Sequence, residues 1–318
     1  MAAVSNGAPT GANPFDFVDI MSSSPQTLGH LLSLAARLKS AHRQLGRNDP
    51  VCAGKVLAMI FEKPSLRTRV SFDVAMTHLG GSAIYISPNE IGLGSREAVP
   101  DVARVLSGMC DAIMARTFAH QTIEQLAAFA SVPVINGLSD RSHPCQAMAD
   151  LLTVQEEFGS LEGRTLAYIG DGNNVARSLL EACGVFKMNF AIATPPGYAL
   201  PAADFQALQS VYRIKTLITS SPKEAVVQAD VIYTDTWVSM GQEDEKAARM
   251  PIFRPYQINS QLLAAAPAHA IVMHCLPAYR NVEITDAVLD GPQSRVFQQA
   301  HNRLHFQKAL LAFQIGGM

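Results

Sequence analysis

The sequence predicts an α/β protein built from two doubly wound domains, each a parallel sheet with helices on both faces. Three observations predict this fold class. Short apolar segments of strand length alternate along the chain with segments of helical periodicity. The apolar segments are continuous, which is typical of parallel strands buried on both sides. At 318 residues, the chain is long enough for two domains of ordinary size.

The first predicted domain covers residues 1–149 and opens with a short disordered leader, residues 1–14. Ser24 and Pro25 then supply an N-cap and a first-turn proline for a helix. Leucines follow at helical spacing, so we expect an amphipathic helix that runs to about Gln44.

Strands and helices then alternate through the rest of this domain. The segment KVLAMIF is a short, wholly apolar strand, and a helix runs from about Ser65 to Gly80. The strands expected here are 55–61, 83–87, 112–116 and 132–137.

The second predicted domain covers residues 150–318 and repeats this alternation after a helix at 143–158. A final helix at about 300–315 is able to pack on either domain, and 300–318 is a candidate to return to the first. The strands expected here are 165–170, 189–194, 213–218, 231–235 and 270–275. Ligands of open parallel sheets bind outside the carboxyl ends of the strands, which is where the polar motifs of this chain fall.

The composition excludes several classes of protein. A net charge of −2 with 48% hydrophobic and 16% charged residues is ordinary for a globular protein and argues against a nucleic-acid partner. No apolar run reaches about 18 residues, so we expect no membrane span. The start of the chain lacks the features of a signal or transit peptide. The five cysteines are scattered and form no CxxC pair, which indicates reduced thiols in a cytoplasmic protein.

A dense group of hydroxyl and guanidinium side chains follows the strand 55–61. Ser65 is placed as an N-cap, so we expect the backbone N–H groups of Leu66, Arg67 and Thr68 to lack partners within the helix and to favour a bound anion. Arg67 adds a planar fork that fits two phosphate oxygens, and Thr68 adds a hydroxyl. The alternative is a capped helix with solvated arginines. The chain has no GxxxxGK[ST] segment, so a nucleotide P-loop is excluded.

Two further stretches are candidates for the same site. Arg116 ends the strand 112–116, where an arginine either closes on the anion or remains solvated. In SHPCQ, His143 and Gln146 lie three residues apart at a helix start, and the helix dipole favours a neutral His143 that polarises a carbonyl. A metal site is the alternative for His143, but further spaced ligands are missing. HNRLH, residues 301–305, lacks the glutamate of a zinc-binding helix.

The strand ends of the second domain carry three more candidate segments. IGDGNNV resembles a dinucleotide fingerprint, but Val175 stands where its third glycine is needed. The alternative is that Asn173 and Asn174 present amides to a small polar ligand. TDTWVSMG places Asp235 at a strand end, with Ser239 and Met240 after it, and HCLP places Cys275 and Leu276 at the end of the last strand.

Together these stretches resemble the aspartate/ornithine transcarbamylase family, most closely its ornithine-using branch, over nearly the whole chain. SLRTR is similar to the S-T-R-T-R signature for carbamoyl phosphate, and SHPCQ to H-P-[CI]-Q. DTWVSMG is similar to D-x-W-x-S-M-G, and HCLP is unaltered. The aspartate-using branch lacks the last two elements, and putrescine-type enzymes lack S-M-G.

The resemblance implies transfer of the carbamoyl group from carbamoyl phosphate to the δ-amine of L-ornithine, which gives L-citrulline and phosphate in a step of arginine biosynthesis or the urea cycle. It also implies a homotrimer with sites at subunit interfaces and no cofactor, metal or nucleotide. The carbamoyl-phosphate residues that it implies are Ser65, Leu66, Arg67, Thr68, Arg116, His143, Gln146, Cys275, Leu276 and Arg303, of which Arg67, Arg116, His143 and Cys275 are catalytic. The ornithine residues that it implies are Asn174, Asp235, Ser239 and Met240.

Two departures from the family pattern and three alternatives accompany this expectation. Leu66 replaces the usual threonine and keeps only its backbone N–H, and His301 stands where glutamate is usual beside Arg303. The alternatives are a nicotinamide-dependent oxidoreductase using IGDGNNV, a catalytically silent binding subunit, and a transcarbamylase for another amine, such as putrescine or an N-acylated ornithine.

Overall fold

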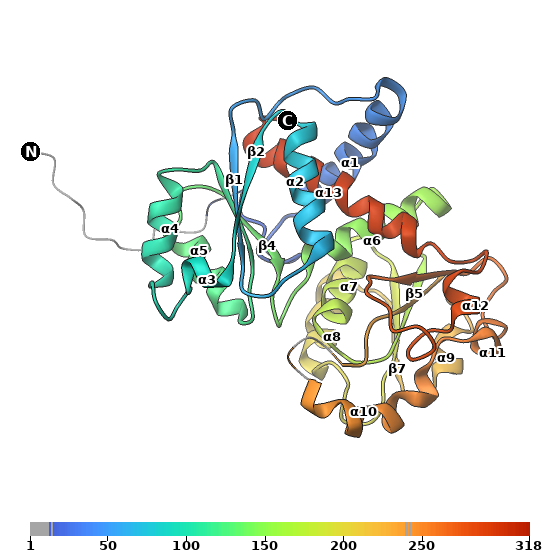
Figure 1. Ribbon diagram of the computed structural model, residues 1–318. Helices are drawn as coiled ribbons and strands as arrows, with labels where there is room; N and C mark the ends of the chain where they lie inside the picture. The colour runs from blue at the N-terminus through green and yellow to red at the C-terminus, as the bar shows by residue number, and fades with distance from the viewer. Residues whose placement is uncertain (1–12, 14, 239–240, 242) are drawn as a thin grey trace, which may run out of the picture. The chain divides into compact units, whose positions relative to one another are not determined.

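The computed structural model describes residues 13, 15–238, 241 and 243–318, and this part of the chain divides into two compact units (Figure 1). Unit 1 consists of the described residues up to Cys145 together with Arg303–Met318, and unit 2 of Gln146–Asn302. The two boundaries fall inside the helices α6 (Pro144–Phe158) and α13 (Val296–Ile315). The expected leader falls on residues outside the described part, apart from residue 13.

Unit 1 is built on a four-stranded sheet in the order β2-β1-β3-β4. Every neighbouring pair of strands is parallel, with Phe61 opposite Arg116 at the carboxyl ends of β1 and β3. The fold class predicted from the continuous apolar strands is therefore confirmed for this unit. The strands are β1 (Val56–Phe61), β2 (Ser82–Ile86), β3 (Ala112–Arg116) and β4 (Val134–Leu138).

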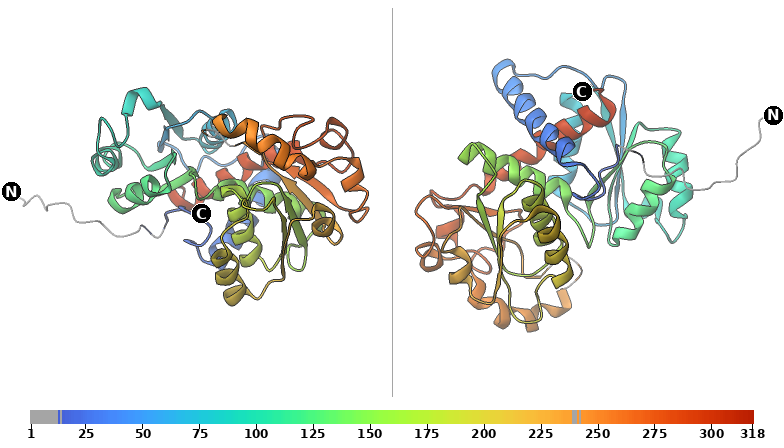
Figure 2. Two further views of the ribbon diagram at one scale, coloured as in Figure 1. Left: turned by 90° about the horizontal axis from the view of Figure 1, so that it is seen from below. Right: turned by 180° about the vertical axis from the view of Figure 1, so that it is seen from behind.

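Helices cover both faces of this sheet (Figures 1 and 2). One face carries α1 (Pro25–Leu45), α2 (Leu66–His78) and the C-terminal half of α13, and the other carries α4 (Val99–Ser107) and α5 (His120–Phe129). The short helix α3 is Pro88–Ile91. On the α4 and α5 side, apolar strand residues such as Ile60 and Ile113 pack with Val102 and Leu126. Because strand side chains alternate between faces, the continuous apolar strands supply both cores.

The start of α1 has the local structure that its sequence predicts. The Ser24 hydroxyl accepts a hydrogen bond from the backbone N–H of Thr27 at 3.0 Å, and Pro25 is the first helical residue. The helix ends at Gly46, which has a left-handed backbone with φ of 69°. This conformation is easily adopted by glycine, so the short-range signals at both ends are sufficient to fix the bounds of the helix.

Unit 2 is built on a five-stranded sheet in the order β7-β6-β5-β8-β9, again with every neighbouring pair parallel. The predicted fold class is confirmed here too. Chain order reverses beside β5, so β5 and β8 form the switch point at which ligands of such sheets bind. The strands are β5 (Thr165–Ile169), β6 (Asn189–Ala193), β7 (Thr216–Thr219), β8 (Val231–Thr234) and β9 (Ile271–His274).

The helices of unit 2 again lie on both faces of the sheet (Figure 1). The helices α7 and α8 contact each other on one face, and α9, α11 and α12 form a core with the other. In that second core, Ala167, Ile232 and Val272 pack with residues of the connecting segments, such as Tyr256 and Ile258. The helices are α7 (Asn174–Val185), α8 (Ala202–Tyr212), α9 (Pro222–Val226), α10 (Lys246–Phe253), α11 (Ser260–Leu263) and α12 (Asp286–Leu289), with 3₁₀ turns at Glu243–Glu245 and Arg254–Tyr256.

Two sequence expectations about the whole chain are also addressed by the fold. No helix in the described ranges is long and apolar enough to cross a membrane. All five cysteines are buried free thiols. Their burial within the two cores is consistent with scattered cysteines acting as small apolar residues.

A group of cationic and imidazole side chains lies buried or half-buried in unit 1, away from the carboxyl ends of its strands. The α13 residue Lys308 is fully buried and donates a hydrogen bond from Nζ to Asn48 Oδ1 at 2.6 Å. The rings of His42 and His78 stack with their centroids 4.2 Å apart. Burial, with a smaller contribution from the Lys308 charge, lowers the pKa of His305 to about 3. Burial and Lys308 also lower the pKa values of His42 and His78.

We therefore expect the protein to lose stability as the pH falls from 7 to 5. A histidine whose pKa is lower in the folded protein than in the unfolded chain favours unfolding below about pH 6.5, where the unfolded chain binds more protons. After allowance for solvent screening, His305 accounts for on the order of 1 kcal/mol at pH 5. Urea unfolding midpoints of the parent and of His305→Met at pH 7 and pH 5 measure the contribution of His305. If the midpoint falls equally in the two proteins between these pH values, His305 does not account for the loss of stability.

Candidate active site

The start of α2 is capped by Ser65, as the sequence predicts. The Ser65 hydroxyl accepts a hydrogen bond from the backbone N–H of Thr68 at 3.3 Å and donates one to Thr68 Oγ1 at 3.0 Å. Leu66 is the first helical residue and its side chain is exposed. The leucine at this position therefore leaves the local cap intact. The expectation that the Thr68 N–H is unpaired is wrong, because the Ser65 cap itself takes up this donor.

Arg303 brings α13 to this helix terminus. Its guanidinium is buried and donates from Nη2 to Thr68 Oγ1 at 2.9 Å. Thr68 Oγ1 thus accepts two hydrogen bonds, one from Ser65 and one from Arg303, so its own hydroxyl hydrogen remains for donation. His301, the second departure from the family pattern, is exposed, whereas Arg303 is held by Thr68.

Several cations of unit 1 surround a buried, neutral histidine. His143 directly precedes α6 and is buried, and Arg116 is the last residue of β3 and is also buried. Burial holds the pKa of His143 well below its usual range, and the charges of Arg303, Arg116, Lys63 and Arg67 lower it further, in that order. The structure therefore brings together Arg67, Arg116, His143 and Arg303, which the sequence had placed at separate points of the chain.

Lys63 is a member of this group that the sequence reasoning missed. It follows β1, is 8% exposed, and its Nζ lies 4.7 Å from the centroid of the Phe118 ring. Burial lowers its pKa, and the neighbouring Arg116 lowers it further. The sequence feature that could have identified Lys63 is its position within FEKPSLRTR, at the carboxyl end of the strand that precedes the predicted anion site.

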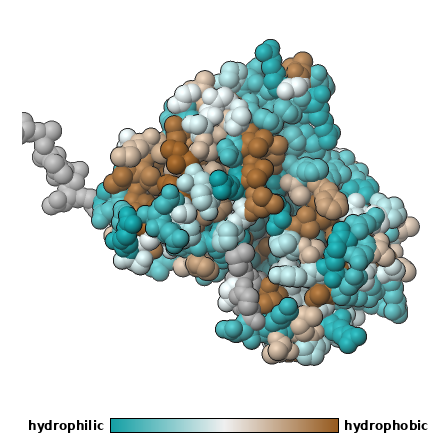
Figure 3. Space-filling view, in the orientation of Figure 1, coloured by the Kyte–Doolittle hydropathy of each residue, from teal (hydrophilic) through white to brown (hydrophobic). Residues whose placement is uncertain are grey.

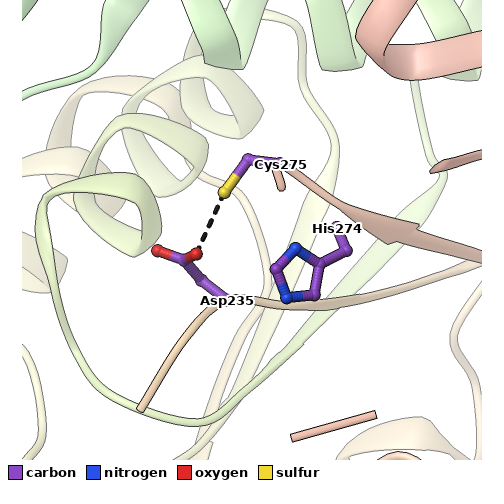
Figure 4. Close-up of side chains that lie close together, drawn as sticks. All are labelled: Asp235, His274 and Cys275. Carbon is purple, nitrogen blue, oxygen red and sulfur yellow. Dashed lines mark hydrogen bonds between the residues drawn. The ribbon is translucent and has the colours of Figure 1, made fainter. Parts of the chain in front are cut away.

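In unit 2, Asp235 lies between two side chains from different strand ends, Cys275, which Figure 4 shows, and Asn173. Its Oδ1 accepts a hydrogen bond from Cys275 Sγ at 3.0 Å, and its Oδ2 accepts one from Asn173 Nδ2 at 2.9 Å. Asn173 is the N-cap of α7 and accepts hydrogen bonds from the N–H groups of Val175 and Ala176. The carboxylate is thus fixed at the switch point between β5 and β8.

Cys275 is held as a neutral thiol by this arrangement. Burial raises its pKa well above the usual range, and the charge of the Asp235 carboxylate raises it further. The thiolate is the nucleophilic form of cysteine, so this residue is suited to orienting a ligand and not to covalent catalysis at neutral pH.

His274, one residue earlier, is engaged at both ring nitrogens. Its Nδ1 accepts a hydrogen bond from the backbone N–H of Leu276 at 2.9 Å, so its Nε2 carries the hydrogen and donates to Glu283 Oε1 at 3.1 Å. Asp235, His274 and Cys275 offer potential metal-ligand atoms within 4.8 Å of one another. Ligation by His274 would break these contacts, which hold Leu276 in a left-handed backbone conformation with φ of 59°.

The segment IGDGNNV forms the turn from β5 into α7. A Cβ on Gly172 would lie 2.6 Å from the backbone of Tyr198 and Leu200, so the turn requires glycine here. Asn174 is the first residue of α7, and Val175 is buried in its first turn. A buried side chain at this position occupies the space that a dinucleotide fingerprint keeps open with its third glycine.

The predicted site residues therefore fall into two groups. The carbamoyl-phosphate residues of unit 1 are Ser65, Leu66, Arg67, Thr68, Arg116, His143 and Arg303, whereas Gln146, Asn174, Asp235, Cys275 and Leu276 belong to unit 2. Ser239 and Met240 lie outside the described residues. Gln146 is buried and donates from Nε2 to Asp150 Oδ1 at 2.8 Å.

Comparison with known proteins identifies the family. Residues 16–156 match the family model of the carbamoyl-P binding domain of aspartate/ornithine carbamoyltransferase, and residues 162–314 match that of its Asp/Orn binding domain. The ornithine carbamoyltransferase of Bacillus subtilis is 50% identical over 301 residues, which cover 93% of this chain and 92% of that protein. The one from Anoxybacillus flavithermus is 48% identical over 299 residues, or 93% and 95% of the two chains.

Solved structures agree with this result. The ornithine carbamoyltransferase from Pyrococcus furiosus matches with a TM-score of 0.92 and 44% identity, covering 98% of this chain and 100% of that one. The Thermus thermophilus enzyme matches with a TM-score of 0.86 and 42% identity, covering 95% and 99%. With both family models and relatives of about half identical sequence matched over most of its length, the chain belongs to the aspartate/ornithine carbamoyltransferase family.

Proposed function

We propose that this protein is an ornithine carbamoyltransferase that uses carbamoyl phosphate and L-ornithine to make L-citrulline and phosphate. The observation that carries this proposal is the group of cations around neutral His143 in unit 1. Four cations, from the first turn of α2, the ends of β1 and β3 and the interior of α13, are suited to a doubly charged phosphate. The δ-nitrogen of ornithine attacks the carbamoyl carbon, the bond from that carbon to the phosphate oxygen breaks, and the nitrogen loses a proton.

Phosphate binding is assigned to the start of α2 and to the end of β3. Ser65, the N–H of Leu66, Arg67, Thr68 and Arg116 would contact the phosphate oxygens. The remaining hydroxyl hydrogen of Thr68 supports its role as a donor. Because these donors are already in place before the reaction, they stabilise charge that develops on the departing phosphate.

The carbamoyl group is assigned to His143, Gln146 and Arg303, together with Cys275 and Leu276. A neutral imidazole is suited to donating a hydrogen bond to a carbonyl oxygen, and its lowered pKa supports this role. Preorganised donors of this kind each contribute about 3–4 kcal/mol to transition-state stabilisation. Holding two substrates together contributes on the order of 7–11 kcal/mol more.

The amino-acid end of ornithine is assigned to Asn174, Asp235, Ser239 and Met240. Asp235 carries a negative charge suited to the α-ammonium, and Asn173 and Cys275 fix its position. The attacking δ-amine must be neutral, although a free alkylamine is protonated at pH 7. The neutral thiol of Cys275 supports a role in orienting this amine.

We further propose a homotrimer acting in the cytoplasm in arginine biosynthesis or a urea-cycle-type step, without metal or cofactor. Figure 3 shows apolar surface on the region of unit 1 that contains α2 and the edge strand β2. Leu66, Val70 and Ile84 are exposed there by 73%, 49% and 51%. Exposed apolar residues beside an unpaired strand edge support subunit contact. A sedimentation-equilibrium mass near that of a single 34.2 kDa chain would contradict it.

The function is tested by phosphate release from carbamoyl phosphate in the presence of a panel of amines. The panel contains L-ornithine, putrescine, N-acetyl-L-ornithine and L-aspartate at equal concentrations. We expect ornithine to give the highest kcat/KM, with stoichiometric citrulline. A higher kcat/KM for another amine identifies that amine as the acceptor instead. If no amine of the panel supports phosphate release, the carbamoyltransferase proposal is contradicted.

A further inference from the structure

A tight, buried turn at residues 139–142 of unit 1 connects the end of β4 to His143. The side chains of Ser139 and Ser142 are fully buried. The Ser139 backbone N–H donates to the Ser142 carbonyl at 2.9 Å, and the Ser142 backbone N–H donates to Ser139 Oγ at 3.2 Å. The turn therefore closes around the Ser139 hydroxyl, and its shape determines where the backbone of His143 lies.

The start of α5 holds this turn at two points. His120 is the first residue of α5 and is buried. Its backbone N–H donates to Asp140 Oδ1 at 2.8 Å, and its ring Nδ1 lies 2.7 Å from Ser139 Oγ. The Asp140 backbone N–H in turn donates to the Phe118 carbonyl at 2.9 Å. Because the N-cap of α5 is Ala119, which has no side-chain acceptor, Asp140 supplies the acceptor that this helix start requires.

The short contact between the hydroxyl and the imidazole has a defined direction. Ser139 Oγ accepts from the Ser142 N–H at 3.2 Å and from Asn136 Nδ2 at 3.4 Å. Hydroxyl groups donate best over roughly 2.5–3.0 Å. The Ser142 carbonyl lies 3.4 Å from Oγ, whereas His120 Nδ1 lies at 2.7 Å, so the hydroxyl hydrogen is directed to the imidazole. His120 is then neutral, with its hydrogen on Nε2, which lies 3.8 Å from Glu124 Oε1.

The surroundings of His120 favour this neutral form. Burial lowers its pKa, and the charge of Arg141 acts in the same direction. The charges of Glu124, Asp19 and Asp140 oppose this effect without cancelling it, so the pKa stays below the usual value. A buried imidazole of lowered pKa is an acceptor at neutral pH and loses this ability when it is protonated in acid.

We propose that His120 is a positioning residue, which accepts a hydrogen bond from Ser139 and so fixes the turn that places His143 for carbamoyl transfer. This inference rests on the proposed function, in which His143 polarises the carbamoyl carbonyl. His120 itself acts only through the turn. When its Nδ1 is protonated, two donors face each other, and we expect the turn to loosen and the alignment of His143 to be lost.

The test compares His120→Asn with His120→Leu. The Oδ1 atom of asparagine can accept from Ser139 at the place of imidazole Nδ1, whereas leucine is of similar size and has no acceptor. We expect His120→Leu to lower kcat/KM for carbamoyl phosphate about 10-fold, as for loss of one hydrogen bond. His120→Asn should stay within about threefold of the parent. The inhibition constant of inorganic phosphate should change less than twofold in both variants, since the phosphate is assigned to α2 and to the end of β3.

A pH profile gives a readout that a merely structural role would not change. The ratio of kcat/KM in His120→Asn to that in the parent cancels the ionisations that the two proteins share, including those of the substrates. We expect this ratio to be constant above pH 7 and to rise as the pH falls to 5, because only the parent loses its acceptor by protonation. Circular dichroism checks that both proteins remain folded at each pH. This comparison decides the question even if His120→Leu does not fold.

A double variant tests whether His120 acts through Ser139. If it does, His120→Leu combined with Ser139→Ala should lose no more kcat/KM than the worse of the two single variants, because all three break the same hydrogen bond. Two losses that add would mean that the residues act independently, and this outcome overturns the proposal.

The matched control is Ser107→Ala, which removes another hydroxyl that links two segments of unit 1. Ser107 Oγ donates to the Ala103 carbonyl at 2.7 Å and accepts from the Ser131 N–H at 3.0 Å. We expect this variant to lower stability and to keep kcat/KM within about twofold. The proposal is also overturned if His120→Leu keeps the parental kcat/KM, if His120→Asn is as impaired as His120→Leu, or if the pH ratio is flat. A parent without carbamoyl transfer would instead contradict the proposed function.

Discussion

Arg67→Lys is expected to lower kcat/KM for carbamoyl phosphate by at least about 100-fold, the effect typical of removing one preorganised donor. Arg67 lies in the first turn of α2, and its charge acts on buried His143 together with those of Arg116 and Arg303. Lysine keeps the charge but cannot make the two parallel hydrogen bonds of a guanidinium to a phosphate. Steady-state kinetics with saturating ornithine measure the effect.

The control for this substitution is Arg104→Lys on α4. Arg104 is paired with exposed Asp101 at 3.2 Å, with both side chains largely in solvent. We expect kcat/KM of Arg104→Lys for carbamoyl phosphate to remain within about twofold of the parent value, because such surface pairs contribute little. If Arg67→Lys also stays within about threefold, the assignment of the α2 terminus to phosphate is wrong.

Asp235→Asn is expected to lower kcat/KM for ornithine by roughly 30-fold to several thousand-fold, which corresponds to about 2–5 kcal/mol for a desolvated charge pair. The carboxylate is 8% exposed and is fixed by Asn173 and Cys275. Asparagine has nearly the same shape but no charge for the α-ammonium of ornithine. KM for carbamoyl phosphate should change far less, since its phosphate residues belong to unit 1.

The measurement is kcat/KM for ornithine and putrescine in the parent, in Asp235→Asn and in Asp204→Asn. Asp204 is paired with Arg177 at 2.6 Å and serves as a carboxylate control in the same unit. Putrescine has no α-carboxylate, so a site built for one can discriminate by on the order of 10⁴–10⁵-fold. Comparable values for the two amines in the parent would rule out the ornithine assignment and leave carbamoyl transfer intact.

Local sequence signals were enough to predict the elements that position the candidate site. The cap at Ser65 depends on residues within a few positions of one another. Glycine at position 172 indicated a turn, although its close approach to Tyr198 and Leu200 is set by the fold. The apolar strands predict parallel sheets, and such sheets collect their polar strand ends at one edge. This reasoning was sufficient to select Arg67, Asp235 and Cys275.

Other features of the candidate site were decided only by the tertiary structure. The helix dipole led us to expect a neutral His143, but the burial and the four cations that lower its pKa come from distant segments, including Lys63, which the sequence reasoning missed. The turn that leads to His143 contacts His120, which lies 19 residues before Ser139 along the chain. By itself, the sequence determined which chemical groups stand at the strand ends. Their protonation states and orientations required the fold, because burial, charge and hydrogen-bond direction depend on neighbours that periodicity and local motifs do not identify.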